Sequence, residues 1–114
     1  MASGWHGGNS CKPEVWHSPT GSGWLLDTDN AAWVGTNGDG RFEYTLTAFK
    51  NASGVNKLYF IDGFPCFSYP GGIGGDVWSS TDGATWTALT TNNTTLAERV
   101  GHVTLAFNGK LYVI

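Results

Sequence analysis

Short stretches of β-branched and aromatic residues, each bounded by glycine, asparagine or aspartate, recur along the chain. Such stretches are typical of β-strands, because branched and aromatic side chains pack well on a pleated surface. The only stretch near a helical period, 95–100, is too short to form a stable helix. The pattern therefore predicts an all-β chain, with strands at 14–18, 24–27, 42–49, 57–61, 76–80, 86–90, 102–107 and 110–114.

Two of the connections carry turn residues of their own. Asn108-Gly109 lies between two predicted strands and marks a two-residue hairpin, because both residues tolerate positive φ. Thr81-Asp82-Gly83 separates 76–80 from 86–90 in the same way. Neighbouring strands are therefore expected to pair antiparallel.

The strand pattern is duplicated within the chain. Three blocks recur in the same order, since 14–18 matches 76–80, 41–49 matches 99–107, and 57–61 matches 110–114. The spacing between matched blocks shortens along the chain, which places insertions in the loops of the first copy. The chain is therefore expected to be one unit, 1–114, of two repeats with four short strands each.

Composition and charge narrow the classes of partner. Charged residues make up 13% of the chain, about half the usual share, and the formal net charge is −3. A nucleic-acid or anionic-membrane partner would require a basic patch, so neither is expected. Residues 1–5 lack the layout of a signal peptide and no apolar run is long enough to cross a bilayer, so the default expectation is a cytoplasmic protein.

The second copy resembles a kelch repeat of a β-propeller. Arg99-x-Gly101-His102, followed by 106–114, is similar to the first half of such a repeat, and 76–86 to its second half. Residues 80–86, with Ser-x-Asp, a glycine and Thr-Trp, also resemble the Asp-box turn of bacterial propellers. The first copy matches less well, because Thr20 replaces the aspartate and Glu43-Tyr44 replaces Gly-His.

The resemblance implies blades of four antiparallel strands, named a to d outward from the central axis. The chain then runs c-d, a-b-c-d, a-b, so that repeat 1 spans about 14–75 and repeat 2, about 76–114, is completed by 1–13 of a neighbouring chain. The loop from one chain to the next would have nearly the length of the loop within the chain. A head-to-tail homo-oligomeric ring is therefore expected, a six-bladed trimer being favoured over a dimer or tetramer. A fragment of a larger propeller is the open alternative.

Loop aromatics are the candidate ligand-binding residues, because they lie outside the strand pattern. Stacking on sugars or contact with a protein surface would suit them, although they could instead cap the ends of the blades. Two residues of the kelch pattern, at the predicted axis, are added as weaker candidates. The full set is Trp5, His6, Trp33, Phe64, Phe67, Tyr69, Arg99 and His102. A structural role is expected instead for Asp82, Trp86 and Trp24.

Enzymatic chemistry is poorly supported by the sequence. A sialidase needs an arginine cluster, yet Arg41 and Arg99 are the only arginines, and the histidines lack the spacing of a copper site. Glu43 and Glu98 are the one conceivable glycosidase pair. Four residues could supply oxygen ligands for calcium, namely Asp27, Asp29, Asn30 and Asp39. Their spacing fits no regular calcium loop and is better explained by Asx turns. Neither a metal nor another cofactor is therefore expected.

The two cysteines fall in corresponding predicted connections on one face. Cys11 and Cys66 could form a disulfide, but without a secretion signal free thiols are favoured. Taken together, the sequence predicts a non-enzymatic kelch-like propeller module that binds carbohydrate or protein. The alternative functions are a glycan-active enzyme with a site shared between subunits, and a propeller fragment without function of its own.

Overall fold

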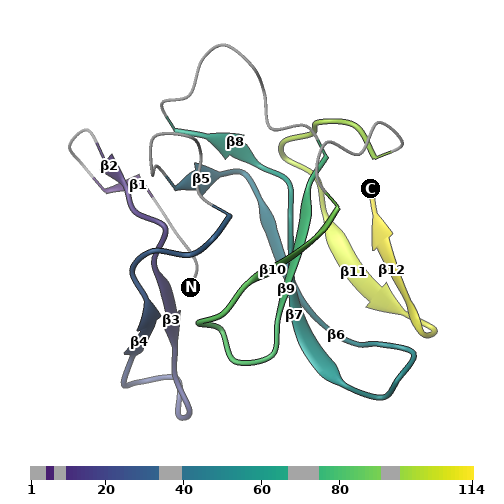
Figure 1. The fold of residues 1–114 in the computed structure, drawn as a ribbon, viewed down its shortest axis with the longest axis horizontal. Coiled ribbons are helices and arrows are strands. Elements are labelled where there is room, and N and C mark those ends of the chain that lie inside the picture. Colours follow the sequence, from purple (N-terminus) through teal and green to yellow (C-terminus); the bar gives the residue numbers. More distant parts are fainter. Residues whose placement is uncertain (1–4, 7–9, 34–39, 67–74, 91–95) are drawn as a thin grey trace.

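The computed structural model describes residues 5–6, 10–33, 40–66, 75–90 and 96–114 (Figure 1). These ranges contain only strands, turns and loops, so the expected all-β class is confirmed for them. They hold no helix with the length and apolar character that a membrane crossing requires. The strands form one four-stranded sheet and four two-stranded sheets, all with antiparallel pairing.

The four-stranded sheet, called the central sheet below, is an antiparallel meander. Its strands, in the order in which they lie side by side, are β6 (Thr45–Lys50), β7 (Asn56–Ile61), β9 (Val77–Ser80) and β10 (Thr87–Thr90). Phe60 of β7 lies opposite Leu46 on one side and Trp78 on the other. Three of these strands lie within one residue of their predicted bounds, and β6 begins three residues later than the strand predicted over 42–49.

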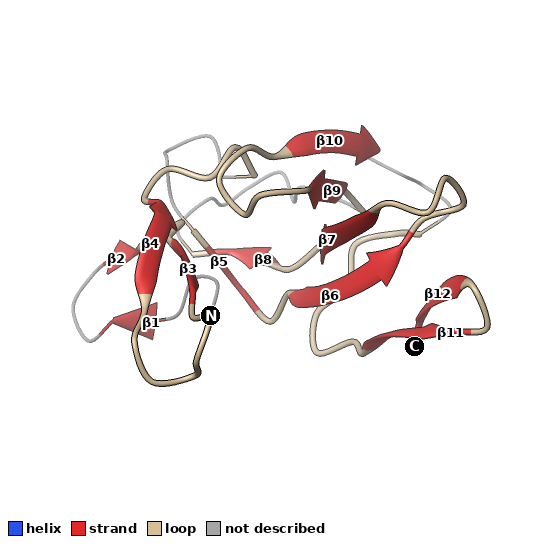
Figure 2. Ribbon diagram, turned by 90° about the horizontal axis from the view of Figure 1, so that it is seen from below, coloured by secondary structure: helices blue, strands red, loops and turns tan. Residues whose placement is uncertain are grey.

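Two hairpins flank the central sheet on opposite sides (Figures 1 and 2). They are called the terminal hairpins below. One pairs β3 (Val15–His17) with β4 (Leu25–Thr28), and the other pairs β11 (Thr104–Phe107) with β12 (Lys110–Val113). Asn108 and Gly109 both have positive φ, at 48° and 70°, as the two-residue turn requires.

Two short ribbons were not expected from the sequence. β1 (Trp5–His6) pairs with β2 (Ser10–Cys11), and β5 (Arg41–Phe42) pairs with β8 (Phe64–Pro65). The single strand predicted over 42–49 is wrong in one respect, because Glu43 has a φ of 54° and breaks it. The break turns β5 away from the central sheet and lets it pair with β8 instead.

The core lies between the central sheet and the hairpin β3–β4. Trp33 stacks on Phe60 with 4.2 Å between ring centroids, and Trp86 packs edge-on against Trp33 at 6.2 Å. Val15 of β3 and Ala31 complete this buried cluster. Offset and edge-to-face ring contacts of this kind add to the stabilisation from area burial. The aromatic cluster therefore holds the first terminal hairpin against the central sheet.

Candidate functional site

A buried ionic cluster lies at the end of the central sheet where β5 meets the start of β9. Arg41 opens β5 and Asp76 directly precedes β9, and both side chains are almost completely buried. The guanidinium donates to both carboxylate oxygens, at 2.5 Å to Oδ1 and 2.7 Å to Oδ2. This two-pronged geometry suits arginine, whose planar donors match a carboxylate. A buried charge needs such a partner, because an unpaired one is costly to desolvate.

Asp62 is the second acidic residue of this cluster, and it directly follows β7. Its backbone N–H donates to the Asp76 carbonyl at 3.0 Å, and its own carbonyl accepts from Arg41 at 3.3 Å. Its Oδ2 accepts from the backbone N–H of Arg99 at 2.6 Å. Asp62 therefore joins the end of β7 to the residue that precedes β9 and to the segment that leads into β11.

The carboxyl group of Asp62 titrates in an unusual range. Burial raises its pKa to about 6, and the nearby negative charge of Asp76 acts in the same direction. The hydrogen bond from the Arg99 backbone opposes this rise in pKa. A carboxyl with such a pKa can exchange a proton near neutral pH, which is the property required of a general acid or base. Because Asp62 is fully buried, however, its observed contacts join segments of the protein.

Hydrogen bonds also join β6 to β11 directly. Thr45 Oγ1 lies 2.5 Å from Thr104 Oγ1 and 3.0 Å from His102 Nε2, and Thr47 Oγ1 donates to the Thr104 carbonyl at 3.2 Å. Burial lowers the pKa of His102 below its ordinary value, and the positive charge of Arg99 adds to this effect. Both effects favour the neutral form of the His102 ring. In the structure this candidate ligand residue lies between two strands and contacts Thr45.

The expected aromatic ligand face is only partly present in the described residues. Trp33 is fully buried in the core, so its assignment as a ligand-binding loop residue is wrong. Phe64 is half-buried and lies 5.4 Å, between ring centroids, from the exposed Phe42. Four further candidates lie outside the described part, Phe67 and Tyr69 altogether and Trp5 and His6 in their side chains. Of the predicted loop aromatics, Phe64 is therefore the one that the described part of the chain shows outside the core, and it packs against Phe42, which was not predicted.

The turn between β9 and β10 is held by the Asp82 carboxylate. Its Oδ1 accepts from the backbone N–H groups of Ala84 and Thr85, at 2.9 and 2.7 Å, and from the Ser80 hydroxyl at 3.0 Å. These hydrogen bonds, the one from Thr85 foremost, lower the pKa of Asp82. Trp86 donates its indole N–H to the Gly83 carbonyl at 2.8 Å and packs into the core. Trp24, to which we assigned a similar structural role, is half-exposed instead.

Matched positions of the two copies make matched contacts. The Ser80 hydroxyl accepts from the Gly83 N–H at 2.8 Å, and the Ser18 hydroxyl accepts from the Gly21 N–H at 2.7 Å. Likewise, the indole of Trp78 donates to the Asp76 carboxylate at 2.7 Å. The indole of Trp16 donates to the Glu14 carboxylate at 3.1 Å. The serine, the tryptophan and the acidic residue thus make the same local contacts at the two positions.

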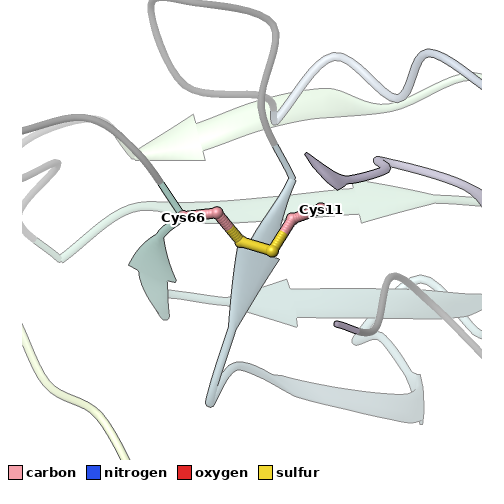
Figure 3. The surroundings of a disulfide bond; sticks show 2 residues. All are labelled: Cys11 and Cys66. Carbon is pink, nitrogen blue, oxygen red and sulfur yellow. A yellow bond between two sulfur atoms is a disulfide. The ribbon is translucent and has the colours of Figure 1, made fainter. Parts of the chain in front are cut away.

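A disulfide joins Cys11 to Cys66, with 6.0 Å between the two Cα atoms (Figure 3). The expectation of free thiols is therefore wrong. The bond links the end of β2 to the residue that follows β8, across a sequence separation of 55. Gly40 lies between the two segments, because its N–H donates to the Cys11 carbonyl and its carbonyl accepts from the Cys66 N–H. Sequence could not decide this pairing, because bonding depends on how closely the fold brings the two Cα atoms together.

Residues weighed for metal binding or catalysis are spread over separate contacts. Asp27 lies 2.7 Å from His17 Nδ1, and the Asn30 backbone donates to the Thr28 hydroxyl, while Asp39 lies outside the described residues. Among the residues that the structure describes, no group of three or more His, Cys, Asp or Glu could hold a metal ion. Glu43 and Glu98 are both exposed. No protein-family model, curated protein or solved structure matches the chain.

Proposed function

We propose that the chain is a two-repeat unit of a kelch-like β-propeller that associates head to tail with further copies. A trimer with six blades is the favoured ring. We also propose that the assembled ring binds carbohydrate or protein without transforming it. In this proposal the central sheet is a complete blade, and each terminal hairpin is half of a blade that a second copy completes.

The distribution of exposed apolar side chains carries the proposal. In the hairpin β11–β12 and directly after it, Phe107 and Ile114 are 67% and 75% exposed, and in the hairpin β3–β4 Leu25 is 57% exposed. Trp24, Leu26, Leu105 and Tyr112 add to the same two surfaces. Exposed apolar side chains gathered in this way mark contact with another surface.

The arrangement of the strands supports the same proposal. β6 and β11 are the strands named a in the two repeats, and they are joined through Thr45, Thr47 and Thr104. Neighbouring blades of a propeller likewise meet through their innermost strands. The contacts of Ser18 and Trp16, which repeat those of Ser80 and Trp78, agree with a c strand in β3 as well as in β9.

The molar mass in solution tests the assembly, measured by light scattering coupled to size exclusion. We expect the mass of two to four chains, three being favoured, and a shift toward one chain in Phe107→Asp. Val55→Asp is the matched control, because Val55 is also exposed but lies in the loop between β6 and β7. A wild-type monomer, or equal effects of both substitutions, would contradict the proposal.

The proposed ligand surface includes the pair Phe42–Phe64, whose rings are partly open to solvent. We expect the assembled species to bind on a glycan array or to a protein surface, and Phe64→Ala to weaken that binding. Turnover of a glycoside by the assembled species, lost in Glu43→Gln, would overturn the binding role. It would favour the alternative of a glycan-active enzyme shared between subunits.

A further inference from the structure

Each partner of the buried ion pair Arg41–Asp76 has a matching residue in a segment that leads into one of the terminal hairpins. The duplication matches 41–49 with 99–107, which places Arg99 at the position of Arg41. It also matches 14–18 with 76–80, which places Glu14 at the position of Asp76. Arg41 and Asp76 form a buried pair, whereas Arg99 and Glu14 belong to segments on opposite sides of the central sheet (Figure 1).

The Glu14 carboxylate already makes one of the contacts that the Asp76 carboxylate makes. Its Oε2 accepts from the Trp16 indole at 3.1 Å, as Asp76 Oδ2 accepts from the Trp78 indole at 2.7 Å. Its only ion pair among the described residues is with the exposed Lys12, at 3.8 Å. Such a surface pair contributes little to stability and is readily exchanged for a stronger partner.

Arg99 carries the complementary charge. Its guanidinium is half-buried and donates to the backbone carbonyls of Leu96 and Ala97. Within the described ranges it forms no ion pair with a carboxylate. A carbonyl satisfies a donor but does not neutralise the charge, so burying this side chain further would require a carboxylate.

The register of the central sheet shows how the two segments would meet. Within it β7 pairs with β9, so that Phe60 lies opposite Trp78 and Ile61 opposite Val77. At the matched positions of the terminal hairpins, Val113 would lie opposite Trp16 and Ile114 opposite Val15. β12 pairs only with β11, and β3 only with β4, among the described strands. Each therefore has an edge on which that pairing could form.

We propose that a second copy of this chain docks its β3 edge against β12, and that its Glu14 forms a buried ion pair with Arg99. The proposal rests on the proposed function, since it specifies the interface of the ring. The alternation of side chains fixes the register of this pairing, because a shift of one residue would turn the apolar side chains of β3 to the opposite face. The pair also favours this antiparallel orientation, because in the reverse one Glu14 would lie at the Lys110 end of β12, away from the segment of Arg99.

Charge reversal tests the pair. Arg99→Glu and Glu14→Arg each place like charges across the interface, and we expect either one to weaken association by at least about tenfold in light scattering. The double variant restores opposite charges and should recover most of the wild-type association. Lys50→Glu is the control, because Lys50 is exposed on β6 and lies outside the interface.

The outcomes separate this inference from the proposed function. A monomeric wild type would overturn both. An oligomeric wild type whose mass is unchanged in Arg99→Glu would overturn only the ion pair, as would a double variant no better than either single one. Circular dichroism of each single variant checks that the chain still folds. A loss of association counts as support for the ion pair only in a variant that retains the wild-type spectrum.

Discussion

The central sheet and the terminal hairpins carry the same sequence block in very different surroundings. Leu58-Tyr59-Phe60-Ile61 of β7 matches 111–114 at the end of the chain. Tyr59 and Ile61 are 8% and 2% exposed, whereas Tyr112 and Ile114 are 41% and 75% exposed. The difference lies in the neighbours, because among the described strands β7 has one on each side and β12 pairs with β11 alone. Burial in this fold is therefore determined by which strands are present, and the sequence of a strand does not determine it alone.

The same contrast holds for the tryptophans that follow the two matched turns. Trp86 packs into the core with Trp33 and Phe60, whereas Trp24 at the matched position is half-exposed. The two turns also differ, because the Asp82 carboxylate receives three hydrogen bonds and Thr20 occupies the corresponding position in the first copy. In the central sheet the tryptophan is therefore more deeply buried, and the turn before it has more side-chain hydrogen bonds, than in the hairpin β3–β4.

The largest expected effect is a difference in unfolding free energy between substitutions at two matched positions, Phe60 and Val113. Phe60→Ala removes the ring that stacks on Trp33 and Tyr44, and we expect it to lower the free energy of unfolding by about 3–5 kcal/mol. Val113→Ala, at the matched position of β12, should cost about 1 kcal/mol or less when measured on the dilute chain. Urea unfolding measures both. Equal losses would contradict the contrast between the two regions.

Loss of the disulfide is expected to have the next largest effect. Cys11→Ser together with Cys66→Ser frees a loop with a sequence separation of 55, which should lower the free energy of unfolding by about 2–4 kcal/mol. The stabilisation acts on the unfolded chain, so adding a reductant to the wild type should give a similar loss. A double variant as stable as the oxidised wild type would contradict the assigned role of this bond.

The strands could be predicted from the sequence because they depend on local pattern. Short runs of branched and aromatic residues, bounded by turn residues such as Asn108-Gly109, indicate the strands of the central sheet and of both hairpins. The break at Glu43 could not be predicted in this way, because its positive φ arises where β5 leaves the sheet to pair with β8.

The contacts of the candidate site could not be predicted, because they join residues far apart in the chain. The sequence showed Trp33 only as a loop aromatic, and its burial follows from the position of Phe60 and Trp86 beneath it. The pair Arg41–Asp76 likewise depends on how β5 meets β9. Asp62 was not a candidate in the sequence, because its burial and its contacts with Arg41 and Arg99 arise only in the fold.

Asp62 should make the stability of the chain depend on pH. Its folded pKa of about 6 lies above the ordinary value of 3.8, so the folded state binds the proton more tightly than the unfolded state. Its contribution to stability is therefore full below pH 4 and is lost as the pH rises through 6. Comparing wild type with Asp62→Asn over this window isolates the effect. Parallel pH profiles of the two proteins would contradict it.

The smallest expected effects concern the two turns. Asp82→Ala removes the acceptor of the Ala84, Thr85 and Ser80 hydrogen bonds and should lower the urea midpoint by less than the loss of the disulfide does. Thr20→Asp supplies the matching carboxylate to the turn of the first hairpin, and a small rise in the midpoint is expected. A fall caused by Thr20→Asp would show that the two turns are not equivalent.

The difference between the two regions is tested most directly by amide hydrogen exchange at increasing protein concentration. We expect strong protection in β7 and β9 at every concentration, and protection in β3 and β12 that rises as the chains associate. Exchange in β3 and β12 that stays fast while β7 remains protected, whatever the concentration, would contradict it. The terminal hairpins would then not be completed by a second copy of the chain.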